Sequence, residues 1–97
     1  NDLRLLFSGD GRDGSTGIRQ NAEFFFGQLD QDRTIVLQPE ATLPHVWIQV
    51  VSGKMRVDLT HLEQADGLAI EEMNQKVEIR SDEKCSFFVF RLPSGKE

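Results

Sequence analysis

The stretch HVWIQVVSGKMRVDLT, residues 45–60, holds the two clearest extended runs of the chain, separated by the pair Ser52-Gly53. In the second run apolar and polar residues alternate, which is the period-two pattern of a half-buried strand. The apolar positions of that run are Met55, Val57 and Leu59. A glycine-containing turn tolerates the positive φ that tight hairpins need. This stretch therefore predicts a β-hairpin.

The rest of the chain continues this pattern outward, as short extended runs bounded by turn residues. The expected strands are residues 3–7, 18–29, 34–37, 68–70, 76–80 and 85–92. Residues 71–75 could form one helical turn at most, and no other segment has a helical period. Many short strands at intervals of about ten residues indicate an antiparallel sandwich or barrel. We therefore expect an all-β fold in one domain over residues 1–97.

Two of these strands are apolar on both faces, which is unusual for a small sandwich. In the last strand one face carries Phe88, Phe90 and Leu92, and the other carries Phe87 and Val89. In residues 45–51, the opposed sets are Val46, Ile48 and Val50 against Trp47 and Val51. One interpretation is that these strands lie centrally or beneath a loop. The other is a second buried surface, made by a partner domain or a dimer.

Composition restricts the classes of partner. The chain has 97 residues, of which 38% are hydrophobic and 28% charged, with a formal net charge of −5. It has no basic patch, so nucleic acid and anionic membranes are poor candidates. No apolar run approaches the roughly 20 residues that span a bilayer, and no secretory signal opens the chain. One cysteine cannot form an internal disulfide, which favours the cytoplasm, although the mature part of a secreted protein could look the same.

The chain begins at Asn1, without a methionine, so we expect either a processed protein or a piece of a longer one. Residues 9–14, GDGRDG, match the G-x-G-x-x-G pattern of dinucleotide-binding loops. That motif needs a helix to begin at its glycines, and a β-type run follows instead. We interpret the segment as a tight structural loop. No frame fits an EF-hand, and a looser calcium site at Asp10 and Asp13 stays open.

The residues that most often carry chemistry are few here. His45 and His61 are the only histidines, at the start and the end of expected strands, and neither has a second ligand at a metal-binding spacing. Cys85 lies in an apolar strand, where a buried inert thiol is the ordinary state. Trp47 is expected in the core. Spacing alone therefore indicates no catalytic, cofactor-binding or metal-binding residues.

The order of five landmarks resembles one family over nearly the whole chain. They are SGDGRDGS (residues 8–15), IRQNAEF (18–24), HVWIQVVSG (45–53), ADGLAI (65–70) and FFVFRLP (87–93). Together they look like the C-terminal cupin of pirin-like bicupins, the pirin and quercetin 2,3-dioxygenase-like proteins. The glycine-aspartate loop is the most specific landmark. The two turns at Gly53 and Gly67 recur across cupins and are weaker.

The resemblance implies a double-stranded β-helix, the jelly roll, with two such domains packed together in one chain. In that family the N-terminal domain holds a metal through three histidines and a glutamate, and the C-terminal domain usually lacks it. Counting back from Gly53 places the metal glutamate at Val46 and two histidines around residues 39–42. The third histidine would fall near Lys76, where an ammonium group would repel a cation. The resemblance therefore implies no metal and no catalytic residue in this chain.

These observations favour a metal-free, non-catalytic cupin domain that serves as a structural or interaction half of a pirin-like protein. One alternative is part of a quercetin 2,3-dioxygenase-like enzyme whose metal site lies in a missing N-terminal cupin. Another is a barrel that binds a small molecule. The expected partner is the N-terminal cupin domain if the chain is a fragment, or a second copy in a homodimer if it stands alone.

Overall fold

The structure is a computed structural model that describes residues 2–9 and 22–93. Regular structure in these residues is entirely extended. The strands are β1 (Asp2–Gly9), β2 (Ala22–Leu29), β3 (Thr34–Leu37), β4 (His45–Ser52), β5 (Lys54–Val57), β6 (Thr60–Glu63), β7 (Gly67–Ile70), β8 (Val77–Ser81) and β9 (Cys85–Leu92). The described residues include no helix that could cross a membrane.

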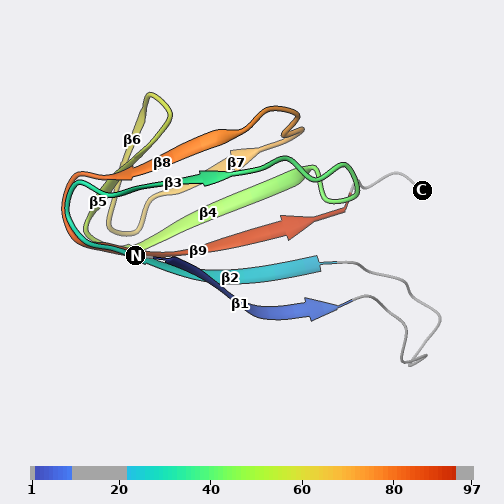
Figure 1. The fold of residues 1–97 in the computed structure, drawn as a ribbon, viewed down its shortest axis with the longest axis horizontal. Coiled ribbons are helices and arrows are strands. Elements are labelled where there is room, and N and C mark those ends of the chain that lie inside the picture. The colour runs from blue at the N-terminus through green and yellow to red at the C-terminus, as the bar shows by residue number, and fades with distance from the viewer. Residues whose placement is uncertain (1, 10–21, 94–97) are drawn as a thin grey trace.

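The strands form two antiparallel sheets that face each other (Figure 1). The five-stranded sheet has the order β1-β2-β9-β4-β7, and the four-stranded sheet has the order β3-β8-β5-β6. Strands from both ends of the chain are neighbours, because β9 lies between β2 and β4. The predicted all-β antiparallel sandwich is confirmed.

The predicted hairpin over residues 45–60 is wrong. Strands β4 and β5 are consecutive in the chain but belong to different sheets, because β4 pairs with β9 and β7 whereas β5 pairs with β6 and β8. Gly53 carries the chain from one sheet to the other with a φ of 84°. A Cβ at Gly53 would collide with the Lys84 carbonyl oxygen and with Cys85. The glycine is therefore required by a sheet crossing rather than by a hairpin turn.

The hairpin in this region joins β5 to β6, and its turn includes Asp58 and Leu59. Leu59 is 91% exposed, so its predicted place on a buried strand face is wrong. Asp58 adopts a φ of 52°, which aspartate tolerates better than most residues. Its amide donates to the Glu78 carbonyl at 2.8 Å, and its Oδ1 accepts from the Glu78 amide at 3.0 Å. These two bonds fix the turn against β8 and end the strand at Val57.

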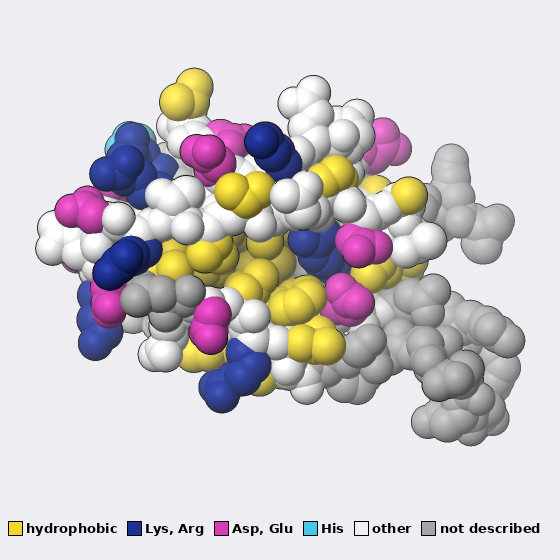
Figure 2. Space-filling model, in the orientation of Figure 1, with side chains coloured by type: hydrophobic (Ala, Val, Ile, Leu, Met, Phe, Trp, Pro, Cys, Tyr) yellow, Lys and Arg dark blue, Asp and Glu magenta, His cyan; other side chains and the backbone are white. Residues whose placement is uncertain are grey.

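The core lies between the sheets, where hydrophobic side chains fill the gap (Figure 2). Strand β9 shows how it forms, since alternate side chains on one face are buried. Phe87 and Val89 have no exposed surface, and Cys85 retains 2%. The prediction of a buried Cys85 is confirmed. Gly27 on β2 leaves room for the Phe87 ring, because a Cβ there would come within 2.5 Å of Phe87 Cζ.

Candidate functional site

The outer face of the five-stranded sheet, which points away from the core, carries a row of aromatic side chains. Register pairs Phe24 with Phe90 and Phe26 with Phe88 across β2 and β9. The ring centroids of these pairs are 4.5 Å and 5.3 Å apart, and those of Phe88 and Phe90 are 6.2 Å apart. Edge-on and tilted contacts of this kind are favourable between aromatic rings. We call this surface the aromatic face and define it by these four residues and Trp47.

Trp47 extends the aromatic face onto β4, where register places it beside Phe90. Its indole lies over Gly67 of β7, and its Nε1 donates to Gln49 Oε1 at 3.2 Å. Gln49 Nε2 in turn donates to the Asp66 carbonyl at 3.2 Å. The ring is held in place but is 39% exposed, so the expectation that Trp47 lies in the core is wrong.

Several large apolar side chains on this side of the sheet remain open to solvent. Their exposed fractions are Phe24 37%, Trp47 39%, Leu92 40% and Val51 43%. Single exposed apolar residues are ordinary, but a contiguous set is typical of an interaction surface. Both two-faced strands lie inside the five-stranded sheet, as the first of the two interpretations expected. The second interpretation, a surface buried by a partner domain or a second copy, stays a prediction.

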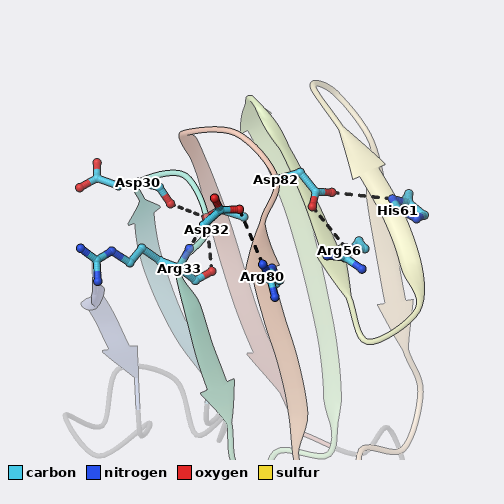
Figure 3. Close-up of polar contacts among 8 residues, drawn as sticks. Asp30, Asp32, Arg33, Arg56, His61, Arg80 and Asp82 are labelled. Atoms are coloured by element: carbon cyan, nitrogen blue, oxygen red, sulfur yellow. Dashed lines mark hydrogen bonds and ion pairs between the residues drawn. The ribbon is translucent and has the colours of Figure 1, made fainter.

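Charged residues gather where β8 turns toward β9 (Figure 3). Asp82 follows β8 and lies 3.3 Å from Arg56 Nε and 3.8 Å from His61 Nδ1. The Arg56 Nε makes no directed hydrogen bond, so its contact with Asp82 is a charge contact. His61 is 75% exposed at its side chain. Partly exposed ion pairs of this kind stabilise by about 0–1 kcal/mol each.

Ser81 anchors the adjacent turn between β2 and β3. It has no exposed surface, its hydroxyl donates to the Asp30 carbonyl, and it accepts from the Arg33 amide at 3.0 Å. The backbone adds two bonds of 2.9 Å, from the Asp32 amide to the Ser81 carbonyl and from the Ser81 amide to the Arg33 carbonyl. Asp32 also reaches Arg80 at 3.7 Å. These bonds hold β3 against β8 (Figure 3), and they indicate a structural role.

The cluster at this end is a weak candidate for catalysis. A shallow cavity of about 210 Å³ adjoins it, lined by Lys54, His61, Leu62, Glu63, Asp66 and Asp82. His61 and Asp82 are too far apart for a hydrogen bond, so the carboxylate does not orient the imidazole as a base would require. Burial raises the pKa of the Cys85 thiol, against a hydrogen bond with the Leu29 backbone that lowers it and with a smaller rise from Asp82, so the reactive thiolate form is disfavoured.

The side chains at the positions where the resemblance would place metal ligands are not metal-binding groups. Val46 presents a buried hydrocarbon side chain to the core, and Lys76 is exposed. His45 and His61 lie on different sheets. Within residues 2–9 and 22–93 no three side chains among His, Cys, Asp and Glu gather closely enough to hold a metal ion. The GDGRDG loop, with the looser calcium site at Asp10 and Asp13, lies outside the described residues.

Sequence reasoning missed a buried cation at the opposite end of the sandwich. Arg91 on β9 retains only 6% of its accessible surface. The alternation of the strand could have revealed it, because residue 91 lies an even number of positions after Phe87 and Val89 and therefore shares their buried face. A cavity of about 420 Å³ opens at this end, lined by Pro39, Ala41, Pro44, Glu72, Met73 and Asn74. Its walls are mainly apolar.

Two antiparallel sheets with this strand order define a cupin-type β-sandwich. Comparison with known proteins identifies the family within that class. Residues 5–92 match the model of the quercetinase C-terminal cupin domain, so the chain belongs to that family. It is 36% identical over 90 residues to the quercetin 2,3-dioxygenase of Escherichia coli K12. The bacterial pirin YhhW from Escherichia coli, solved with nickel(II), superposes with a TM-score of 0.80 at 34% identity.

These matches cover nearly all of this chain but only part of the relatives. The alignment takes in 93% of this chain and 38% of the Escherichia coli K12 dioxygenase, and 97% of this chain and 40% of the YhhW structure. A quercetin 2,3-dioxygenase from Acinetobacter baumannii shares the fold, with a TM-score of 0.72 at 20% identity over 32% of its length. The chain thus spans about two fifths of the length of the curated relatives it matches.

Proposed function

We propose that this domain is the metal-free, non-catalytic half of a longer cytoplasmic pirin-like protein, and that it binds the other half through the aromatic face. The single observation that carries the proposal is that face. Trp47 and Phe24 are more than one third exposed there, although they belong to an ordered set of packed rings. Covering such a surface stabilises by about 25 cal/mol per Å² of apolar area.

The proposed partner is another part of the same polypeptide, and the greater length of the relatives supports this choice. About three fifths of the length of those relatives lies outside the part that this chain matches. A second domain from the same polypeptide is therefore available in proteins of that length to cover the aromatic face. If the chain stands alone, a second copy is the simplest substitute, because a two-fold axis buries the same patch on both partners.

Charging the aromatic face tests the proposal. Phe88→Glu with Phe90→Glu is expected to leave the 97-residue chain folded while abolishing its self-association in sedimentation experiments. In the longer parent protein the same pair is expected to separate the two halves, which small-angle scattering would register as a larger radius. Leu59→Glu is the matched control, since Leu59 is 91% exposed at a hairpin tip remote from that face. An unchanged radius in the parent protein would contradict the proposal.

The metal-free part of the proposal rests on the residues at the expected ligand positions. A buried valine at position 46 offers no lone pair, and a lysine at position 76 carries the wrong charge. We expect chain purified from metal-supplemented medium and washed with a chelator to hold well under about 0.1 equivalents of nickel, iron or copper. Stoichiometric metal after that wash would overturn this part.

A second candidate is participation in flavonol oxygenation, with the metal in the other half. Its support is the 36% identity to a protein named quercetin 2,3-dioxygenase. In that case the longer parent protein oxidises quercetin and this chain alone does not. Oxygen consumption by the two preparations with quercetin distinguishes a purely structural protein from an enzyme that has this domain as its non-catalytic half.

A further inference from the structure

From the groove beside Trp47 we infer a seat for an arginine side chain that the other half of the parent protein supplies. The arginine contact rests on the proposed function, because it is one part of the interface at the aromatic face. The groove has a volume of about 310 Å³ and is lined by residues of β4, β7 and the end of β9. This volume is at the low end of the range for small-molecule sites, which suits one long side chain.

The groove is continuous with the aromatic face. Trp47 belongs to both, and register places it beside Phe90 of β9. Leu92 and Ala69 also line the groove, and they pair with His45 and Trp47 respectively. Because β7 is the last strand of its sheet, the groove lies at the border of the surface that the partner would cover. Interfaces have an apolar centre and a more polar rim, so a charged contact is expected at this border.

The groups in the groove attract a cation. Of the described residues that line it, Glu71 carries the one carboxylate, and its side chain is exposed. The Trp47 Nε1 already donates to Gln49 Oε1 at 3.2 Å, so the 39% exposed indole offers a partner its electron-rich ring. The formal net charge of −5 further disfavours an anionic group. A carboxylate and an indole that line one groove therefore match a cationic side chain.

Arginine suits these two groups better than lysine. Its planar guanidinium stacks on aromatic rings, is more weakly hydrated than an ammonium group and presents several donors to a carboxylate. Its aliphatic stem covers apolar surface, which Leu92 and Ile70 supply in the groove. The other ionisable group there is His45, which would repel a guanidinium only when protonated. Binding is therefore measured at about pH 8, where histidine is neutral.

The 97-residue chain tests the groove directly, because Trp47 is its only tryptophan. The probe is acetyl-arginine amide, and acetyl-citrulline amide is its neutral counterpart of nearly the same shape. At constant ionic strength we expect the arginine compound to change the Trp47 emission saturably and the citrulline compound to leave it unchanged. Equal responses to the two compounds, or no response to the arginine compound, would overturn the inference.

Two adjacent carboxylates provide matched variants. Glu71 lines this groove, whereas Glu72 lines the separate cavity beside Pro44 and Met73. Glu71→Gln should weaken binding of the arginine compound by about threefold, a size typical of exposed ion pairs, and Glu72→Gln should leave it unchanged. Both variants remove one negative charge from an exposed side chain. Equal weakening by the two would reveal a general charge effect and refute the site.

In the parent protein, the arginine contact is tested separately from the aromatic face. Glu71→Arg should lower the urea concentration at which small-angle scattering registers separation of the two halves, and Glu72→Arg should not. If Phe88→Glu with Phe90→Glu separates the halves but Glu71→Arg has no effect, the arginine contact is wrong and the proposed interface stands. If the phenylalanine pair leaves the radius unchanged, the interface itself is wrong and the arginine contact falls with it.

Discussion

At the scale of single residues, backbone strain is concentrated at a few turns. Among the described residues, non-glycine residues with positive φ are Asp32 at 63°, Asp58 at 52° and Ala65 at 75°. Aspartate enters this region with little penalty because its side chain bonds to nearby backbone, as Asp58 does. Alanine has no such compensation. Ala65 is held there because its amide donates to the Val50 carbonyl at 3.1 Å, between β6 and β7.

Ala65→Gly should stabilise the chain. Relief of the left-handed strain stabilises the folded chain by about 1–2 kcal/mol. The greater conformational freedom of glycine in the unfolded chain offsets about 0.4–1 kcal/mol of that gain. The expected net gain in the free energy of unfolding is about 0.5–1 kcal/mol, measured by urea denaturation. Ala69→Gly, in the middle of the short strand β7, is the control and should destabilise. Destabilisation by both would show that Ala65 is not strained.

Cys85 should make stability fall at alkaline pH. Burial raises the pKa of its thiol from the ordinary value of 9.0, against a hydrogen bond with the Leu29 backbone that lowers it and with a smaller rise from Asp82. Above that pH the unfolded thiol loses its proton while the folded thiol keeps it, so the folded state binds more protons. The free energy of unfolding then declines, by at most about 1.4 kcal/mol per pH unit. Stability is unaffected by this thiol below pH 9 and is lost as pH rises toward its folded pKa.

The chain lacks tyrosine, which makes this alkaline loss easier to assign. Urea unfolding between pH 7 and pH 10 should show a steeper decline for the wild-type chain than for Cys85→Ala. The slopes are compared rather than the absolute values, because the variant also loses core packing. Parallel pH profiles for the two proteins would show that the thiol contributes nothing to this decline.

At the scale of elements, two glycines reveal how differently the faces of the five-stranded sheet are packed. Gly27 of β2 faces inward, and a Cβ there would meet the fully buried Phe87 ring. Gly67 of β7 faces outward, and a Cβ there would meet the indole of Trp47. The Phe87 ring has no space to move into, whereas the half-exposed indole can swing toward solvent. The same substitution should therefore have different costs on the two faces.

Gly27→Ala should destabilise by about 1–3 kcal/mol, the range for overpacking a filled core. Gly67→Ala should cost less than about 1 kcal/mol but should displace Trp47, which is the only tryptophan of the chain. Urea denaturation measures the first effect, and tryptophan emission with acrylamide quenching measures the second. A larger loss of stability from Gly67→Ala than from Gly27→Ala would mean that the aromatic face is packed as tightly as the core.

At the scale of the whole molecule, the last strand completes the fold. Strand β9 pairs with β2 and with β4, so it occupies the centre of the five-stranded sheet. Removing it also removes Cys85, Phe87 and Val89 from the core. Strand β1, by contrast, lies at the edge and pairs with β2 alone. Loss of β9 should therefore abolish folding, whereas loss of β1 should only lower the free energy of unfolding.

Truncation after Lys84 should yield an unfolded chain, because β2 and β4 lose their shared neighbour and the core loses three residues. Deletion of residues 1–9 should leave a folded chain with a lower free energy of unfolding. Far-ultraviolet circular dichroism with urea titration would distinguish a missing transition from a shifted one. A cooperative transition in the chain truncated after Lys84 would contradict the central role of β9.

Much of this architecture was readable in the sequence. Strand β9 begins and ends where the apolar run does, and its alternation correctly assigned Phe87 and Val89 to one face and Phe88 and Phe90 to the other. Successive side chains of an extended backbone point to opposite faces whatever strands lie beside it. The face of each side chain can therefore be predicted without knowing the partner strands. The family follows from landmarks along the whole chain. Leu59 was misassigned because an isolated strand pattern does not reveal where a turn interrupts it.

What the sequence by itself determined is an all-β chain of this cupin family with strands apolar on both faces. Only the tertiary structure decided that β4 and β5 enter different sheets, that Trp47 lies outside the core, and that Arg91 lies within it. The reason is physical, since alternation tells which side chains share a face but not which sheet a strand joins. Sheet membership is set by hydrogen-bonded pairing between segments distant in the chain. The aromatic face and the buried cation exist only once those pairings have formed.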